Sequence, residues 1–564
     1  MTWGKRRAIV IGVLLIFVAL VIWAAWKPQR LASNSVLVID AEGSIEEQAP
    51  PSFFAPLTGN SVPVLHDYLD AIDSAKTDAR VTGIVMRIAP LSTGWAKLEE
   101  IRRHLMSYRA SGKPSICYLG YDGIGNPEYY LASACEQVWL VPSNPVDIRG
   151  MMAEALFLRG TLDKLKIIPE FYHIAEFKTA TNMFTEKKFT PSHREEVESV
   201  LRSVYDQYVS GAAEARGMDR VQFESILNGG PLLSADAVAD KIVDKLGYWD
   251  QVEDFFKSKH HGWNPVSLNA YRNYLKDDAF DGGPELAVVN ATGLIVSGES
   301  QTTPGGGFVM GGDSVARDLR DARDNSSVRA IVLRIDSGGG SVVGSEVIRR
   351  EVELAQRQKP VVVSMSDVAA SGGYWIATPA AKIVADANTI TGSIGVLTGK
   401  LNLSGLYNLL GLSTDYVATS DNATLFSDQQ NFSPAQEAYI RKSLDETYAE
   451  FTQGVAKGRK MSVQAVDKIG KGREWSGAQG KDLGLVDEIG GFDRAIAVAK
   501  DLAKIPASAS VHIVRYPEEK SLFEQLLQRE KDLTESRSLE EMARRIVGVM
   551  EPVQARVPYE LHIR

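Results

Sequence analysis

Ser371 stands among small residues in the stretch Val368–Trp375 (VAASGGYW), just past an apolar run. Two glycines follow it, and glycine permits unusual backbone angles and the close approach of another chain. A serine at a strand-to-helix turn presents its hydroxyl at a helix N-terminus. Acyl transfer needs such a nucleophile, with N–H groups aimed at the developing oxyanion. The alternative interpretation is that Ser371 caps the helix and the glycines form a turn.

A second glycine-rich loop, Asp336–Ser341 (DSGGGS), follows the preceding apolar strand. The N–H of Gly372 can supply one oxyanion donor, and this loop can supply another or pair with an extended peptide. A serine nucleophile also needs a base. The chain contains no Ser-x-x-Lys, and no Gly-x-Ser-x-Gly surrounds Ser371. His173 is a candidate base, although a single histidine on a strand is more typical of a structural role.

The elements that position these residues occur twice, in the same order. The matching segments are Ala79–Arg103 with Ser326–Arg350, Tyr121–Ala134 with Ser366–Pro379, and Leu233–Gly247 with Trp475–Gly490. Arg87 and Arg334 are 247 residues apart, and the Val-Asp pairs of the third match are 243 apart. A long-period repeat of this kind predicts two tandem homologous domains. Asn126 takes the place of Ser371 in the first repeat, which also lacks the glycine loop.

Each repeat is predicted to be α/β. Short runs rich in β-branched residues are typical of buried parallel strands, and their alternation with helical patterns predicts right-handed crossovers. We expect the long helices at 193–217 and 434–459 to be counterparts. The predicted domains are residues 36–284 and 285–515, followed by a charged, helical tail at 516–564.

The N-terminus contains 19 uncharged residues, Ala8–Trp26, after the basic stretch Gly4–Arg7. Such a run is long enough to span a membrane, and the basic flank predicts that Met1 faces the cytoplasm. A cleaved signal peptide has a shorter apolar region and a small-residue cleavage site. We therefore expect residues 1–35 to hold an uncleaved transmembrane anchor, with its helix at about residues 8–26.

Charge and cysteine content exclude several classes of function. The net charge of −9 and the lack of a basic block argue against a nucleic-acid partner. The two cysteines, Cys117 and Cys135, are expected to be buried thiols, although outside the cytoplasm they could pair. Two cysteines and eight scattered histidines give no metal-ligand spacing.

Three motifs together resemble one family: VAASGGYW, the loop at Asp336–Ser341, and Thr391–Val396 (TGSIGV). They are similar to the signal peptide peptidase A family, in the long duplicated form also called protease IV. The resemblance covers nearly the whole chain and implies a serine protease with a Ser–Lys dyad that needs no cofactor and no metal. The repeats also resemble the crotonase/Clp-type superfamily fold, built from ββα repeats.

The resemblance implies a role for individual residues. Ser371 would be the nucleophile, and Lys178, in Glu176–Thr181 (EFKTAT), would be the general base. Ser393 would help to hold the lysine, and Gly339, with Gly340 as a second candidate, would contribute to the oxyanion hole. Gly338 stands where the family usually has proline, which leaves the donor open. A lysine acts as a base near neutral pH only when its pKa is lowered, and the residues around Lys178 are apolar.

The family also implies a location and a substrate class. We expect a single-pass protein of the bacterial inner membrane, with the catalytic domains on the periplasmic side. The expected substrates are released signal peptides and other unfolded or hydrophobic peptides, and the expected assembly is a homotetramer. Two alternatives stay open: an acyl-CoA enzyme of crotonase fold, and a non-catalytic membrane scaffold or chaperone.

Overall fold

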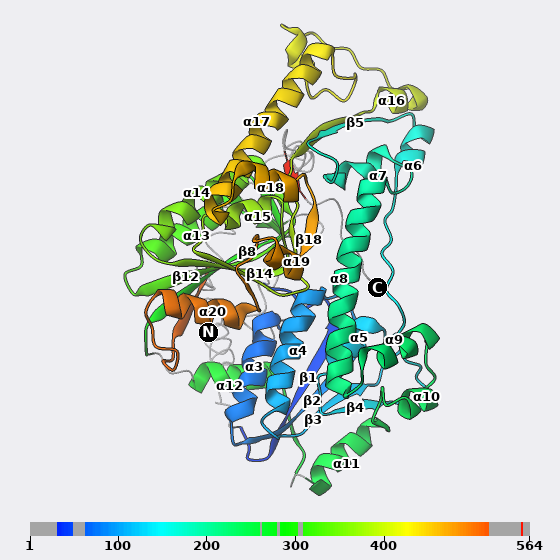
Figure 1. Ribbon diagram of the computed structural model, residues 1–564, viewed down its shortest axis with the longest axis vertical. Coiled ribbons are helices and arrows are strands. Elements are labelled where there is room, and N and C mark those ends of the chain that lie inside the picture. The colour runs from blue at the N-terminus through cyan, green and yellow to red at the C-terminus, as the bar shows by residue number, and fades with distance from the viewer. Residues whose placement is uncertain are drawn as a thin grey trace, which may run out of the picture.

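The computed structural model describes residues 31–48, 62–259, 262–278, 282–302, 308–517 and 554–556. Two α/β units follow one another along the chain, each built on its own sheet, and a third, mixed sheet joins them (Figure 1). The predicted transmembrane helix at about residues 8–26 lies outside the described residues. In the part that is described, no helix is long and apolar enough to cross a membrane.

The first unit contains a six-stranded sheet in the order β6-β4-β3-β2-β1-β7, with every neighbouring pair parallel. Its strands are β1 (Ser35–Gly43), β2 (Val81–Leu91), β3 (Ser115–Leu119), β4 (Gln137–Leu140), β6 (Lys245–Leu246) and β7 (Asn264–Ser267). Its helices are α3 (Leu65–Thr77), α4 (Trp95–Arg109), α5 (Asn126–Ala132), α8 (Pro191–Arg216), α9 (Arg220–Gly229), α10 (Ser234–Ala239), α11 (Trp249–Lys259) and α12 (Leu268–Asp278).

The second unit repeats this plan with the sheet order β18-β16-β14-β12-β8-β20, while β15 and β19 branch from β14. Its strands are β8 (Glu285–Thr292), β12 (Val328–Ser337), β14 (Val361–Ala370), β15 (Lys382–Ala385), β16 (Ile390–Gly392), β18 (Glu474–Ser476), β19 (Glu488–Ile489) and β20 (His512–Tyr516). Its helices are α13 (Gly312–Asp324), α14 (Val342–Gln356), α15 (Gly372–Ala377), α17 (Pro434–Arg459), α18 (Val463–Ile469), α19 (Gly477–Asp482) and α20 (Phe492–Leu502). The predicted tandem α/β organisation is confirmed, and the central strands are buried on both faces as their apolar runs predict.

The third sheet has the order β10-β11-β9-β13-β21-β17-β5. Its strands are β5 (Ile168–His173), β9 (Leu294–Val296), β10 (Gln301–Thr302), β11 (Phe308–Gly311), β13 (Gly339–Ser341), β17 (Leu397–Asn402) and β21 (Gln554–Arg556). The short helices beside it are α6 (Arg159–Lys164), η1 (Thr179–Thr181), α7 (Asn182–Thr185), α16 (Ser404–Leu410) and η2 (Asp421–Thr424).

One segment of the first repeat therefore leaves its own unit. Strand β5 pairs antiparallel with β17 of the second repeat along its whole length. In Figure 1, β5, α6 and α7 lie near α16 at the upper end, and α8 runs back down to the first unit. The sequence does not reveal that β5 lies outside the first unit, because the pairing of β5 with β17 forms only in the tertiary structure.

The tail differs from its predicted helix where it is described. Tyr516 belongs to β20, which extends the second sheet beside β8, and Gln554–Arg556 form a strand. The rest of the predicted helical tail lies outside the described residues. The cysteines also differ from expectation: Cys117 and Cys135 are both buried, but a disulfide joins them.

Buried ion pairs hold the two units together. Arg334 of β12 binds Glu47 at 2.6 Å and Glu100 of α4 at 2.7 Å. Lys97 of α4 binds Asp336 at 2.8 Å and Asp367 at 3.2 Å. Burial raises the pKa of Glu47, but Arg334 and Lys97 outweigh it and hold that pKa at about 2. Each of these buried charges is paired across the interface, so separating the two units would leave buried charges without partners.

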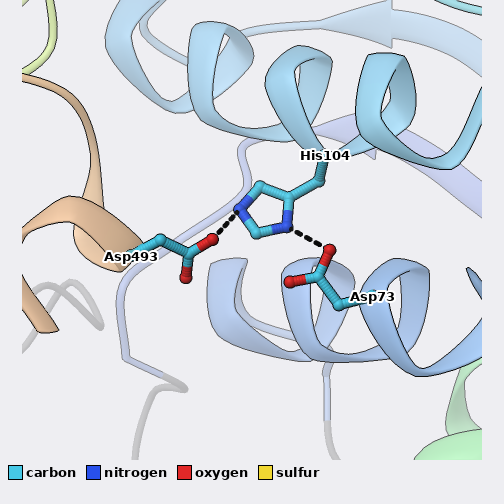
Figure 2. A group of neighbouring side chains, drawn as sticks. All are labelled: Asp73, His104 and Asp493. Atoms are coloured by element: carbon cyan, nitrogen blue, oxygen red, sulfur yellow. Dashed lines mark ion pairs between the residues drawn. The ribbon is translucent and has the colours of Figure 1, made fainter. Parts of the chain in front are cut away.

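His104 joins α3, α4 and α20 in the same interface. Figure 2 shows its ring between Asp73 and Asp493, at 2.9 Å and 3.0 Å. Burial lowers the pKa of His104, but its contacts with Asp493 and Asp73 outweigh it and raise it to about 9. Since each ring nitrogen already faces a carboxylate from opposite sides, the cluster is explained as an ion-pair bridge rather than a metal centre.

Candidate active site

Ser371 occupies a strained turn between β14 and α15. Its backbone has φ +55° and ψ −118°, a conformation that costs energy for a residue with a side chain. Its N–H donates to the Gly392 carbonyl at 2.9 Å, and its carbonyl accepts from the Trp375 N–H at 2.8 Å. Among the described residues, its hydroxyl finds no α15 N–H to cap, so the helix-cap interpretation is wrong. The turn instead aims the hydroxyl away from the helix.

Lys178 reaches this hydroxyl from the other repeat. Its Nζ lies 2.7 Å from Ser371 Oγ, although the two residues are 193 positions apart. The β5–β17 pairing brings the segment to the second unit, and the Phe177 N–H then donates to the Lys471 carbonyl at 3.1 Å. The lysine thus enters the site from the segment that follows β5, a strand held by the unit that carries the serine.

Two glycines make room for the lysine. A Cβ on Gly472, which has φ +80°, would lie 2.4 Å from the Lys178 backbone nitrogen. A Cβ on Gly395 would lie 3.2 Å from the Lys178 Cδ atom. The loop before β18 and the loop between β16 and β17 therefore fit closely around Lys178.

Burial sets the electrostatics of Lys178, whose side chain has no exposed surface. Burial lowers the pKa of Lys178 from its ordinary 10.5 to about 7, although the charges of Glu474 and Glu196 oppose this shift. An ammonium ion loses its hydration in such a place, so the neutral amine becomes accessible near neutral pH. The arrangement is chemically suited to move a proton between Ser371 Oγ and Lys178 Nζ.

Ser393 supports the amine from a second side. Its Oγ lies 3.0 Å and its carbonyl 3.2 Å from Lys178 Nζ. Ser393 has a positive φ of +49°, and its N–H donates to the Arg473 carbonyl at 2.7 Å. Three oxygens from two serines thus surround Nζ and fix its direction.

The glycine loop lies next to this pair as β13. The N–H of Gly339 donates to Ser337 Oγ at 3.1 Å, so it is already engaged within its own loop. Gly340 has φ +151°, and a Cβ there would lie 2.1 Å from the Ile295 carbonyl oxygen. This engagement counts against Gly339 as an oxyanion donor. Gly372, as the first residue of α15, has an N–H that precedes the internal bonds of the helix.

His173 is placed differently. It is exposed at the end of β5, and its Nδ1 lies 2.8 Å from the Ala175 carbonyl oxygen. Although the residue is exposed overall, neighbouring protein atoms partly desolvate the ring and lower its pKa. The position therefore fits the structural role that the sequence favoured, and the contacts of Ser371 go to Lys178 instead.

A model of Peptidase family S49 matches residues 107–261 and 353–506, once in each unit. The chain belongs to Peptidase family S49. The duplicated match confirms the long form of the family and the two tandem domains. Membership in a peptidase family also disfavours the acyl-CoA alternative.

Relatives in the S49 family align over most of the chain. Serine protease SPPA, chloroplastic, from Arabidopsis thaliana is 32% identical over 87% of this chain and 72% of its own. Protease 4 from Salmonella typhi is 33% identical over 92% of this chain and 87% of its own. A solved ClpP1 mutant from Listeria monocytogenes, 17% identical, covers 37% of this chain and 94% of its own with a TM-score of 0.24, a likeness that carries no argument.

Several residues of the candidate site escaped the sequence analysis: Gly395, Gly472, Glu196 and Glu474. The signal for Glu196 was available, because it lies on the buried face of α8 with Val197, Val200 and Val204. A carboxyl on an apolar helical stripe requires a partner. The two glycines gave no comparable signal, since their role depends on a lysine that approaches from the other repeat.

Proposed function

We propose that the chain is a serine peptidase in which Ser371 is the nucleophile and Lys178 the general base. The observation that carries this proposal is the 2.7 Å approach of a fully buried lysine amine to a serine held in a strained turn. Lysine bases of this kind depend on a lowered pKa, which burial provides here.

The chemistry follows from this geometry. The neutral Lys178 amine accepts the Ser371 proton as Oγ bonds to the peptide carbonyl carbon, and the carbonyl oxygen takes up the electron pair. The Gly372 N–H is the donor that we assign to this oxyanion. Lys178 then passes the proton to the leaving amine as the C–N bond breaks, and water cleaves the acyl-enzyme by the same steps in reverse. Ser393 keeps Nζ directed at Ser371 Oγ.

An extended peptide is the substrate that this site accepts. Strand β21 lies between β13 and β17 and pairs antiparallel with Gly339–Ser341, so backbone can lie in this slot as an added strand. A substrate strand would take the same place by main-chain pairing, beside α15 and Ser371. Released signal peptides and other hydrophobic peptides fit the expected location.

We place the protein at the bacterial inner membrane, anchored by Ala8–Trp26, with both units in the periplasm. The disulfide between Cys117 and Cys135 supports an oxidising compartment. Protease added to spheroplasts is then expected to reach both units but not Met1. Protection of both units would contradict this orientation.

The proposed homotetramer has a structural template inside the chain. The segment 411–417 corresponds to β5 and the residue after it at the 243-residue offset, and it exposes Leu412, Tyr416 and Val417. β5 pairs with β17. Strand β17 corresponds to residues 154–159 of the first repeat. We expect residues 411–417 of one copy to pair with residues 154–159 of another copy, near the exposed Leu156. Such head-to-tail contacts form a ring when the rotation between neighbouring copies closes after four of them. Val417→Asp should lower the mass measured by light scattering, and an unchanged oligomer would contradict the contact.

The proposed activity is tested by a fluorogenic peptide assay on the wild-type protein, Ser371→Ala and Lys178→Ala. Both substitutions are expected to abolish turnover while circular dichroism stays unchanged. Full activity of Ser371→Ala would favour a non-catalytic scaffold or a site elsewhere.

A further inference from the structure

Two buried carboxyl groups lie behind Lys178 and take no part in the proton transfers proposed above. Glu196 comes from α8 of the first unit and Glu474 from β18 of the second, and both are almost fully buried. Carboxylates in such places are costly unless they hold specific partners. Their contacts connect the two halves of the candidate site.

Glu196 binds both halves directly. One carboxylate oxygen accepts from the Thr179 hydroxyl at 3.1 Å, and Thr179 is the residue after Lys178. The other oxygen accepts from the Glu474 N–H at 2.6 Å. A single carboxylate therefore ties the lysine segment to β18.

The connection continues to Ser371 through the sheet. Glu474 is the register partner of Gly392 in the antiparallel β16–β18 pair. The Gly392 carbonyl accepts from the Ser371 N–H at 2.9 Å. The path from Thr179 through Glu196, Glu474 and Gly392 thus joins the residue beside the lysine to the backbone of the serine.

The charges of this pair also act on the lysine. Burial raises the pKa of Glu474 to about 7, with Lys178 opposing, and raises that of Glu196. The charged or titratable groups around Lys178 are His173 of β5, Glu196 of α8, Glu474 of β18, and Lys471 and Arg473 of the preceding loop, which pair with Glu176 and Glu195. Glu474 and Glu196 are the acidic groups whose charges bear on the lysine.

We propose that Glu196 and Glu474 form a positioning pair for Lys178: Glu196 accepts from Thr179 beside the lysine and from the N–H of Glu474, and so holds the lysine segment against β18 of the second unit. This inference rests on the proposed function, because it assigns the pair to the Ser371–Lys178 site. Neither residue touches the peptide.

Glu474→Gln tests the charge. Diisopropyl fluorophosphate reports Ser371 directly, because Oγ bonds to phosphorus, fluoride leaves, and the proton passes to Lys178. Because the pKa of Glu474 is itself about 7, its carboxyl is charged mainly above that pH. Removing this charge is therefore expected to raise the labelling rate between about pH 7 and 8, where the wild-type amine is still partly protonated, and to leave the rate below about pH 6 unchanged. Glu198→Gln, which changes an exposed carboxyl on α8 two residues from Glu196, is the control and should leave the labelling rate unchanged.

Glu196 tests the positioning. Glu196→Ala loses both contacts and is expected to lower kcat about 10- to 100-fold with little change in KM, because misplaced reacting groups slow chemistry. Glu196→Gln keeps one acceptor oxygen and should recover much of the loss. Equal losses in Glu196→Ala and Glu196→Gln would overturn the positioning role, as would a change confined to KM.

The two failures are distinguishable. If the wild-type protein is not labelled at Ser371, the proposed function fails. If the wild-type is labelled but Glu196→Ala and Glu196→Gln lose the same amount of kcat, or lose none, the inference fails while the function stands. The melting temperature of each variant identifies one that has not folded, and Glu196→Gln keeps the test available if Glu196→Ala is lost.

Discussion

The two units use one strand–turn–helix for different purposes. Asn126 begins α5 in the first unit, and its side-chain oxygen accepts from the Arg149 N–H at 3.1 Å. Ser371, its counterpart, precedes α15 with a positive φ, and its hydroxyl meets Lys178. Both residues are buried. The same turn therefore fixes a backbone in one unit and presents an oxygen to an amine in the other.

The lysine shows the reverse division. At the 243-residue offset, Lys178 corresponds to Asp421, and the short helices η1 and η2 follow or include the two positions. Asp421 is exposed, whereas Lys178 is buried against Ser371. Each repeat thus contributes one half of the proposed site.

The paired arginines of β2 and β12 differ in the same way. Arg87 binds Asp40 of its own unit at 2.5 Å and remains partly exposed. Arg334 is buried and binds Glu47 and Glu100 of the other unit. Of these two equivalent arginines, Arg87 therefore binds within its own unit and Arg334 binds across the interface.

The largest expected effect comes from substituting the lysine of the proposed site and, separately, its counterpart in the other repeat. Lys178→Met keeps the length of the buried side chain and is expected to lower peptidase kcat/KM about 100-fold or more, since a general base contributes that much. Asp421→Asn, at the repeat counterpart, should leave the rate unchanged. Comparable losses in both variants would show that the halves are not divided as described.

The two arginines are expected to contribute differently to the free energy of unfolding. Arg334→Ala leaves two buried carboxylates unpaired and is expected to cost about 3–5 kcal/mol. Arg87→Ala is expected to cost less than about 1 kcal/mol, because its pair is partly exposed. Urea unfolding of the two variants measures this difference, and equal losses would contradict an interface role for Arg334.

The pH profile sharpens the assignment of the base. Because the pKa of Lys178 is lowered to about 7, its amine is protonated progressively below that pH. We expect kcat/KM to fall about tenfold for each unit below pH 6, as the neutral amine disappears. A flat profile between pH 5 and 9 would argue against a lysine base.

The smallest expected effect is at His104. Its folded pKa of about 9 lies above the unfolded value, so its stabilisation is complete below about pH 6.5 and is lost as the pH rises through 9. Because Asp73 and Asp493 are partly exposed, we expect on the order of 1 kcal/mol. Melting temperatures of wild-type and His104→Gln should differ at pH 6 and converge near pH 10. A difference in melting temperature that stays constant with pH would show that the charge of His104 does not contribute to stability.

Much of the fold is predictable from local pattern. The long helix at 434–459 has the bounds of α17, and the apolar runs around Arg87 and Arg334 form β2 and β12. A strand was also expected around His173, but its partner was not, since β5 pairs with a strand of the other repeat. Pairing between strands that are far apart in the sequence produces no repeating pattern of residues from which it could be predicted.

The candidate site divides similarly. Ser371 was identifiable from its small neighbours, whereas the choice of Lys178 depended on family resemblance, because nothing local connects residues 193 positions apart. Glu474 was missed because its burial depends on α8, β18 and the lysine together. The disulfide was also unexpected, since its two cysteines come from separate elements.

The central claim is that Ser371 is activated by Lys178 across the two repeats. The direct measurement is the mass-spectrometric mapping of the adduct formed with diisopropyl fluorophosphate by the wild-type protein and by Lys178→Met. We predict one adduct per wild-type chain, on Ser371, and its loss in Lys178→Met. An adduct on another residue, or unchanged labelling of Lys178→Met, would contradict the claim.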